Sequence, residues 1–268
     1  MSGSRFRRRN YGRNHGYLFD GLKIMSVTKV LGIGVPKPAL VQWAAGQAAQ
    51  YAVLNSEALF DGRRPLAVVE REIADAANRK RNAAAVKGTT VHRFGERLVK
   101  GERVDGISDE VGKKVDSYVK FLNEWRVEDL ATERPVLITA APVPIGGTFD
   151  LVFRSPLFPE RTFLADIKTG SGVYGEAALQ AEAYSRAEVF LDENDEEVPM
   201  SSLGITDHVV IHVRDDGYSV VQLADGDDAW AAFLAAVGMA RLMDGPRGES
   251  ELDSLVLGEF FRPAEAWT

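Results

Sequence analysis

The chain has 268 residues, of which 45% are hydrophobic and 26% are charged, a balance typical of a globular protein with a sizeable core. Cysteine is absent, which excludes disulfides, thiolate zinc sites, cysteine-held iron–sulfur clusters and a cysteine nucleophile, so any metal needs oxygen or imidazole ligands. The net charge of −7 excludes a uniformly basic DNA-binding protein, so any contact with nucleic acid depends on local basic patches.

Residues 1–20 form a basic leader, with Arg7, Arg8 and Arg9 between the aromatic residues Phe6 and Tyr11. Two interpretations stay open for this leader. The arginines bind DNA phosphates in a salt-dependent way, or the segment is flexible and solvated. The apolar runs that follow are too short to span a bilayer, and no signal-peptide pattern is present. We therefore expect a cytoplasmic protein that does not bind membranes.

Residues 21–268 are expected to form one domain, whose helical part covers about residues 36–126. A short strand or turn segment at residues 23–31 precedes it. Pro38 then introduces a helix to about residue 55, with Trp43 on its core side. Helices over residues 66–86 and 89–99 are predicted to be separated at Gly88. Apolar residues at helical spacing predict an amphipathic helix over residues 108–126, with Ser108 as its N-cap.

The remaining part, about residues 130–225, changes to the period of β-strands. Strands over residues 133–139, 145–154 and 161–168 are separated by proline-rich turns, which predicts an antiparallel three-strand meander. A helix over residues 175–191 follows, then strands over 208–213 and 218–223 and a C-terminal helix over about 225–243. This order predicts an α/β fold with a central mixed sheet and an N-terminal helical elaboration.

Two carboxylates and a lysine are predicted to share one end of this sheet. Asp166 and Lys168 lie on the same face of a strand, about 6.6 Å apart along it, while Ile167 points into the core. Asp150 ends the preceding strand, so the two carboxylates converge if the strands form a hairpin. Converging carboxylates suit Mg²⁺ or Mn²⁺. A D-x-K triplet alone also fits a solvated salt bridge at a strand end.

Three further residues flank this group in the chain. His92 closes a G-x-x-x-H pattern that begins at Gly88, and Gln180 and Tyr184 form a Q-x-x-x-Y pattern on one helix face, about 6 Å apart. Each residue taken singly is more often an ordinary core or surface side chain. Their order and spacing together with the G-G-T-x-D and D-x-K patterns are what favour a function.

This series of patterns, from Gly88 to Tyr184, resembles the RecB-like exonucleases of the PD-(D/E)xK superfamily, including phage and CRISPR-adaptation types. The resemblance implies a restriction-endonuclease-like core with Asp150, Asp166, His92 and the Ile167 backbone carbonyl as metal ligands. It also implies that Lys168 positions or activates the attacking water, that Gln180 and Tyr184 belong to the catalytic group, and that Glu133 is a further acidic residue near the metal. Many relatives carry a four-cysteine iron–sulfur cluster, which this chain cannot form.

The function implied is that of a Mg²⁺- or Mn²⁺-dependent DNA exonuclease acting in phage DNA recombination, repair or processing, in the host cytoplasm if the chain is phage-encoded. DNA is the expected partner, together with a single-strand annealing protein or another recombination partner, and homo-oligomers are compatible with the resemblance. Two alternatives stay open. One is an endonuclease or a partner-dependent DNA-trimming nuclease, and the other is a catalytically inert DNA-binding or assembly module on the nuclease fold.

Overall fold

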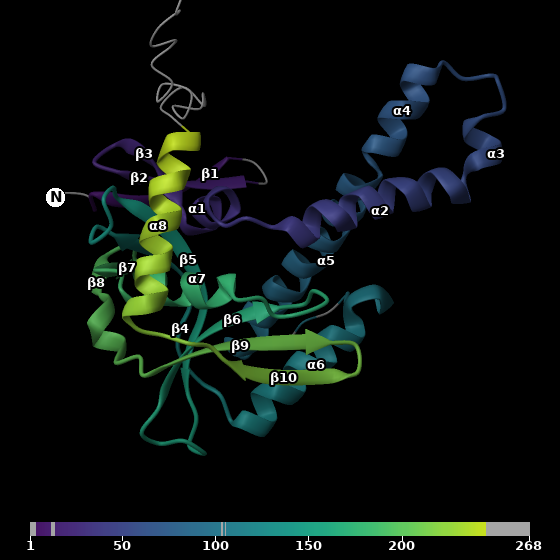
Figure 1. Ribbon diagram of the computed structural model, residues 1–268. Helices are drawn as coiled ribbons and strands as arrows, with labels where there is room; N and C mark the ends of the chain where they lie inside the picture. Colours follow the sequence, from purple (N-terminus) through teal and green to yellow (C-terminus); the bar gives the residue numbers. More distant parts are fainter. Residues whose placement is uncertain (1–3, 12–13, 103, 105, 245–268) are drawn as a thin grey trace, which may run out of the picture.

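The protein is a mixed α/β molecule built on a curled ten-stranded sheet, as the computed structural model shows (Figure 1). The structure describes residues 4–11, 14–102, 104 and 106–244. The predicted α/β class is confirmed. None of the described helices is both long enough and apolar enough to cross a membrane.

The strands alternate with the helices along the second half of the chain and form a hairpin-rich segment at its start. Their bounds are β1 Phe6–Tyr11, β2 Asn14–Phe19, β3 Leu22–Ser26, β4 Glu128–Ile138, β5 Ile145–Arg154, β6 Thr162–Lys168, β7 Val189–Leu191, β8 Glu197–Pro199, β9 Asp207–Arg214 and β10 Gly217–Gln222. Strands β4, β5 and β6 form the predicted antiparallel meander, and β6 also pairs with β9 in parallel. The sheet is therefore mixed, as predicted.

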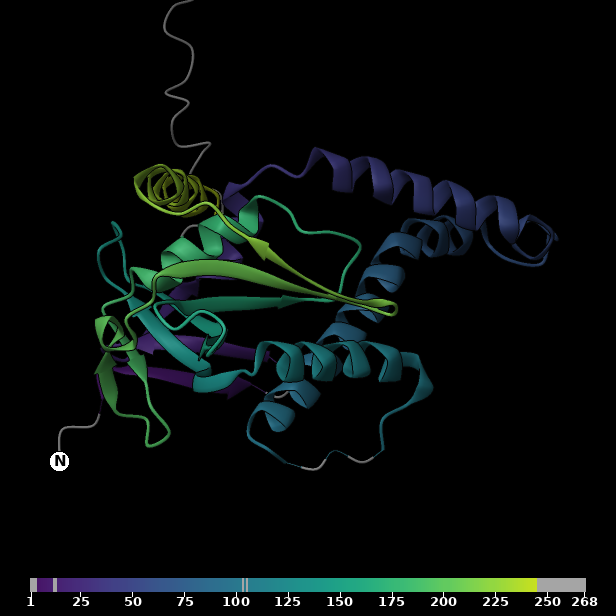
Figure 2. The same ribbon diagram turned by 90° about the horizontal axis from the view of Figure 1, so that it is seen from below.

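The helices fall into two groups. Their bounds are α1 Val27–Gly34, α2 Pro38–Leu54, α3 Ser56–Leu59, α4 Leu66–Ala74, α5 Ala76–Val99, α6 Asp109–Trp125, α7 Glu176–Ser185 and α8 Asp227–Met243, with a 3-10 turn at Met200–Leu203. Helices α1, α7 and α8 pack together against one side of the sheet and α6 packs against β9 and β10, whereas α2, α3 and α4 project away from the sheet and are joined to it through α5 (Figures 1 and 2).

Two apolar layers hold the sheet between its helices. Tyr118 and Phe121 of α6 pack with the β6 and β9 side chains Ile167 and Ile211. On the other side, the larger core joins β4 and β5 to α1, α7 and α8, with Phe233 of α8 fully buried. Because successive strand residues point to opposite faces, Ile167 enters the α6 layer while its neighbours Asp166 and Lys168 face away from it. The predicted alternation along β6 is confirmed.

The basic leader is not a flexible segment in the part that the structure describes. Strands β1 and β2 pair antiparallel, and β2 continues into β3. Phe6 is fully buried and stacks on Tyr17, with ring centroids 6.0 Å apart, while Arg7, Arg8 and Arg9 stay exposed. For the described residues the interpretation as a flexible segment was wrong, because one buried aromatic side chain and a full ladder fix a strand whose other residues are exposed.

Three helix boundaries also differ from the prediction. The predicted break at Gly88 is absent, because α5 runs through it; the break lies at Asp75 instead. The hydroxyls of Thr89 and Thr90 donate to the carbonyls of Ala85 and Val86 one turn earlier rather than capping a new helix. Residues 27–31 of the segment expected as strand or turn instead belong to α1, whose N-cap Ser26 accepts from the Lys29 amide.

The predicted helix over residues 175–191 ends early, at Ser185. Residues 189–191 form β7, which pairs with β4 through Val136↔Phe190 and with β8. Pairing with an otherwise open strand edge therefore overrides the helical pattern. Trp43, expected on a core side, is only half-buried, and in the described structure α2 contains no fully buried residue.

Glu182 of α7 and His208 of β9 form a buried polar pair. Glu182 of α7 accepts hydrogen bonds from Arg186 at 2.5 Å and from the amide of Gly226 at 3.0 Å. Its other neighbour is His208 of β9, which is 5% exposed and whose Nδ1 lies 3.7 Å from Glu182 Oε2. Burial lowers the pKa of His208, although the charge of Glu182 opposes this effect. The imidazole therefore favours its neutral form in the folded protein.

This burial predicts a loss of stability in mild acid. The unfolded chain binds a proton at His208 below its ordinary pKa of about 6.5, while the folded protein resists it, so the free energy of unfolding falls as pH drops through this value. The slope for one proton is at most about 1.4 kcal/mol per pH unit. Denaturant unfolding at several pH values should show a flatter profile for His208→Asn. Parallel profiles for the two proteins would contradict the assignment.

Candidate metal centre

The candidate site lies along one edge of β5, between the residues that pair with β3 and those that pair with β6. Ile145 and Gly146 pair with β3, residues 151–154 pair with β6, and within the described ladders residues 147–150 pair with neither. Asp150 closes this gap with its side chain, since its Oδ2 accepts a hydrogen bond from the Ile167 amide at 2.7 Å. A carboxylate thus takes the place of a backbone carbonyl, and the ladder opens at this point.

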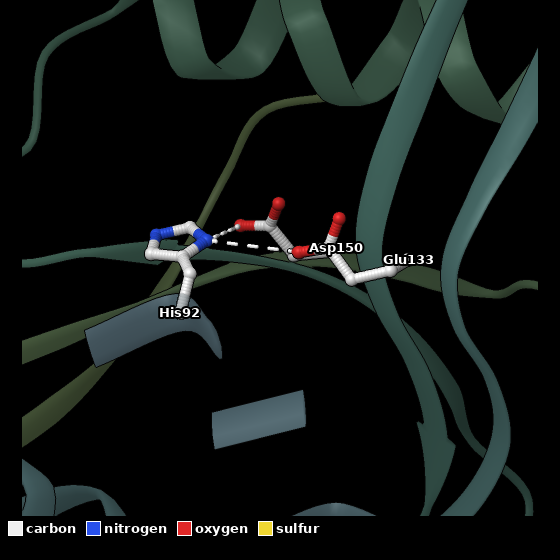
Figure 3. Close-up of side chains that lie close together, drawn as sticks. All are labelled: His92, Glu133 and Asp150. Carbon is white, nitrogen blue, oxygen red and sulfur yellow. Dashed lines mark ion pairs between the residues drawn. The ribbon is translucent and has the colours of Figure 1, made fainter. Parts of the chain in front are cut away.

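Glu133 of β4 stands beside the same gap. Its neighbours Thr132 and Arg134 pair with Leu151 and Phe149, but Glu133 itself has a φ of 53°, in the left-handed region. A non-glycine residue held there costs on the order of 1 kcal/mol or more, and such residues gather at functional sites. The pairing of β4 with β5 is interrupted at this residue, and the Glu133 side chain lies beside Asp150 and His92 (Figure 3).

His92 comes to this gap from α5. Its Nε2 lies 2.6 Å from the carbonyl oxygen of Ile167, and because a carbonyl only accepts, Nε2 carries the hydrogen. The other ring nitrogen, Nδ1, faces the carboxylates, 3.5 Å from Asp150 Oδ2 and 3.9 Å from Glu133 Oε1 (Figure 3). One ligand atom from each of these three residues lies within 4.8 Å of the others.

The charges of this group depend on one another. Burial lowers the pKa of His92, but the negatively charged carboxylates of Asp150 and Glu133 outweigh it, so the pKa lies well above its ordinary value. Burial raises the pKa of Asp150, whereas His92 and the Ile167 amide lower it to below its usual range. Burial also raises the pKa of Glu133. When His92 is protonated, its positive charge offsets part of the negative charge of the Asp150 and Glu133 carboxylates.

Asp166 and Lys168 form an ion pair next to this group. Lys168 Nζ lies 3.0 Å from Asp166 Oδ1 and 2.8 Å from Oδ2, and the Lys168 side chain is 40% exposed. Burial, followed by the negative charge of Asp150, raises the pKa of Asp166 to about 6. Burial lowers the pKa of Lys168, but Asp166 more than compensates, so the ammonium keeps its charge.

Gln180 of α7 contacts this ion pair, and Tyr184 of the same helix contacts Gln180. The Gln180 amide donates to Asp166 Oδ1 at 3.2 Å and to the Tyr184 hydroxyl at 3.3 Å. Tyr184 is buried, and a Cβ added at Gly147 would come within 2.3 Å of its ring. The predicted shared helix face is confirmed, and a residue as small as glycine is required opposite the tyrosine.

The first glycine of the G-G-T-x-D pattern makes room for Tyr17, a residue that the sequence did not single out. A Cβ at Gly146 would come within 2.4 Å of the Tyr17 ring, whose hydroxyl lies 2.8 Å from Thr148 Oγ1. The two glycines therefore admit one tyrosine each, from β2 and from α7. His212 was likewise missed: it pairs with Lys168 across β6 and β9, and its Nε2 lies 2.9 Å from the Gly170 carbonyl oxygen. What relates His212 to the site is its position opposite Lys168 in the parallel pairing of β6 with β9, which the sequence does not show.

The structure brings the predicted residues together in a different grouping. Glu133 joins His92 and Asp150, whereas Asp166 lies outside this group of three and binds Lys168 and Gln180. The Ile167 carbonyl, expected as a ligand, is engaged by His92. Arg7 and Arg8 line a separate pocket together with the acidic residues Glu196 and Glu197, and among the described residues none of the metal group lines that pocket.

The donor set fits a divalent cation. His92 Nδ1 and the Asp150 and Glu133 carboxylates converge, half-buried, and together they carry more negative charge than His92 can neutralise. The Nε2–H bond to the Ile167 carbonyl fixes the tautomer that leaves Nδ1 for a metal, as a second layer of contacts does in metal sites. Oxygen ligands suit Mg²⁺ and Mn²⁺, and the imidazole favours Mn²⁺.

Comparisons with known proteins identify no family. No family model matches the sequence, and no curated protein matches it either. One solved structure, "Crystal structure of SSO0001", aligns with 83% of this chain and 77% of its own, at 12% sequence identity and a TM-score of 0.39. A similarity of this size transfers neither fold nor function to the chain.

We expect Mn²⁺ to raise the melting temperature of the protein, and at lower concentration than Mg²⁺ does. A ligand at about 100 times its Kd stabilises by about 2.7 kcal/mol, which corresponds to several degrees in Tm. Asp150→Asn should abolish the shift, and His92→Ala should reduce the preference for Mn²⁺. The exposed helical residue Asp116 gives the matched control, Asp116→Asn. Equal shifts in Asp150→Asn and the wild type would contradict the site.

Proposed function

We propose that the protein is a metal-dependent DNA nuclease that hydrolyses phosphodiester bonds, with a restriction-endonuclease-like core of the RecB-like PD-(D/E)xK type. One observation carries the proposal. Three acidic side chains, an imidazole and a lysine from four separate segments meet at the opening that the described strands leave beside β5. Residues that merely solvate a strand end have no reason to converge in this way.

The chain's own groups divide the work at this opening. Glu133, Asp150 and His92 would hold the cation, and the negative charge they gather matches a site for Mg²⁺ or Mn²⁺. Such an ion, when bound, polarises a phosphoryl oxygen and lowers the pKa of a water molecule. His92 would exchange the proton on Nδ1 for the ion while its Nε2–H stays on the Ile167 carbonyl.

Lys168 supplies the fixed positive charge that a phosphate needs. Its ammonium is tied to Asp166 on one side, and its partial exposure leaves the remaining hydrogens for a phosphate oxygen or an attacking water. Asp166 is in turn oriented by the Gln180 amide. In this account Lys168 and Asp166 touch the reacting atoms, while Gln180 and the buried Tyr184 act as positioning residues.

An exonuclease is the form of this activity that the sequence resemblance favours, with recombination, repair or processing of phage DNA as its setting. The geometry around Lys168 supports phosphodiester hydrolysis in general and carries no feature specific to DNA ends. The test therefore uses linear and closed circular DNA side by side. Loss of linear DNA alone indicates an exonuclease, and cutting of the circle indicates an endonuclease.

Removal of the lysine should slow the reaction strongly and leave the fold intact. A preorganised charge of this kind contributes about 3–4 kcal/mol to the transition state, so Lys168→Ala should lose on the order of a hundredfold or more in rate. The measurement is digestion of end-labelled DNA with Mg²⁺, Mn²⁺ or EDTA, with thermal unfolding as the check on folding. Asp166→Asn should be equally impaired.

Lys120→Ala serves as the matched control, because Lys120 is an exposed helical lysine in a weak pair with Glu124. Its rate should equal that of the wild type. Cleavage by Lys168→Ala at the wild-type rate would overturn the assignment of Lys168. A folded, metal-binding wild type that cleaves neither substrate would instead favour an inert DNA-binding module or a nuclease that needs a partner.

A further inference from the structure

Helix α5, which carries His92, has an unusual charge for this acidic protein. Between Ala76 and Gly95 it contains no aspartate or glutamate. The same stretch carries five cationic residues, Arg79, Lys80, Arg81, Lys87 and Arg93. In a chain whose net charge is −7, this stretch is a local region of one sign. A basic stripe of this kind along a helix is typical of a surface that binds a polyanion such as a nucleic acid.

The middle of this stretch is exposed to solvent. Every residue from 78 to 87 is exposed, because α5 here spans from the projecting helices α2 and α4 to the sheet (Figures 1 and 2). A helix that is exposed all round and carries no apolar face gains nothing from packing. Its surface is therefore available to a ligand over about two to three turns.

One face of this segment leads directly to the metal centre. At 100° per residue, Arg81, Ala85 and Gly88 fall within about 40° of the direction of His92. Ala85 and Gly88 present almost no side chain, and a Cβ at Gly88 would already lie 3.2 Å from Thr169 Oγ1, in the loop that follows Lys168. The face therefore presents no large side chain from Ala85 to Gly88, where Thr169 meets it beside the catalytic group.

The cations of α5 are not equally available. Arg79 donates to the Glu72 carbonyl and lies over the Tyr51 ring, Lys80 donates to Gln47, and Lys87 pairs with Glu110. Arg93 lies over the ring of its neighbour Phe94. Arg81 makes no hydrogen bond, ion pair or ring contact with any residue that the structure describes. An exposed guanidinium without a partner, on the face of the catalytic histidine, is the group that remains free to bind an anion.

We propose that the DNA strand being cleaved lies along this face of α5, with Arg81 binding a backbone phosphate outside the metal centre. The inference rests on the proposed nuclease activity and deepens it by giving the strand a path. Arg81 and His92 are eleven residues apart, about 16 Å along the helix axis. This distance spans about five phosphates of a B-form strand, whose charges recur every ~3.4 Å along the axis.

The test separates binding from cleavage. Affinity for a labelled DNA oligonucleotide of about 20 nucleotides is measured by fluorescence anisotropy in EDTA, at several salt concentrations. Arg81→Ala should weaken binding about fivefold near 0.1 M salt and reduce the salt slope by about one contact. Arg81→Lys should restore most of both. Arg241→Ala, which removes an exposed helical arginine of α8, should leave them unchanged.

Cleavage then tests the reach of the contact. Arg81→Ala should raise KM for the long oligonucleotide with kcat unchanged, and should have no effect on a substrate of about 3 nucleotides, which is too short to reach it. Suppose that the wild type cleaves DNA and that Arg81→Ala has the same affinity and the same rate. The inference about Arg81 is then overturned, and the proposed nuclease activity stands. If Arg81→Ala loses affinity but the wild type never cleaves, the binding face stands and the proposal that this chain cleaves DNA by itself is overturned.

Discussion

The candidate site depends on one departure from regular β-structure: the Asp150 carboxylate, rather than a backbone carbonyl, accepts the hydrogen bond of the Ile167 amide. A continuous ladder between β5 and β6 would leave no room for ligands at this edge. Because the pairing stops at Leu151↔Ala165, the carboxylate can reach across while the two strands remain joined. The left-handed backbone at Glu133 extends the same opening to β4. Regular pairing on either side keeps the opening rigid.

Burying several carboxylates together requires compensation, and the structure distributes it over three kinds of partner. The Ile167 amide and His92 stabilise the charge of Asp150, and Lys168 and Gln180 stabilise that of Asp166. The compensation is incomplete, since the pKa values of Glu133 and Asp166 remain raised. A divalent cation bound here would supply the missing positive charge, and this is the physical basis of the proposed metal centre.

Local periodicity predicted the parts of the fold that local interactions determine. The meander, the α6 helix with Ser108 at its N-cap, and the alternation of Asp166, Ile167 and Lys168 follow from the spacing of apolar residues. Long-range contacts set the rest. Gly88 alone predicts the end of a helix, but in the structure Thr169 packs against it within a continuous helix. The arginine-rich leader alone is compatible with a flexible segment, but in the structure Phe6 stacks on Tyr17. The resemblance implied that Glu133 lies near the metal, but the left-handed φ angle of this residue is contained in no sequence pattern.

The central claim is that the opening beside β5 binds one divalent cation through His92, Glu133 and Asp150. The most direct measurement is X-ray diffraction from crystals grown with Mn²⁺, with data collected so that manganese scatters anomalously. Our account predicts an anomalous peak in contact with His92 Nδ1 and with the carboxylates of Glu133 and Asp150. A peak elsewhere on the protein, or none at this opening under saturating Mn²⁺, would contradict it.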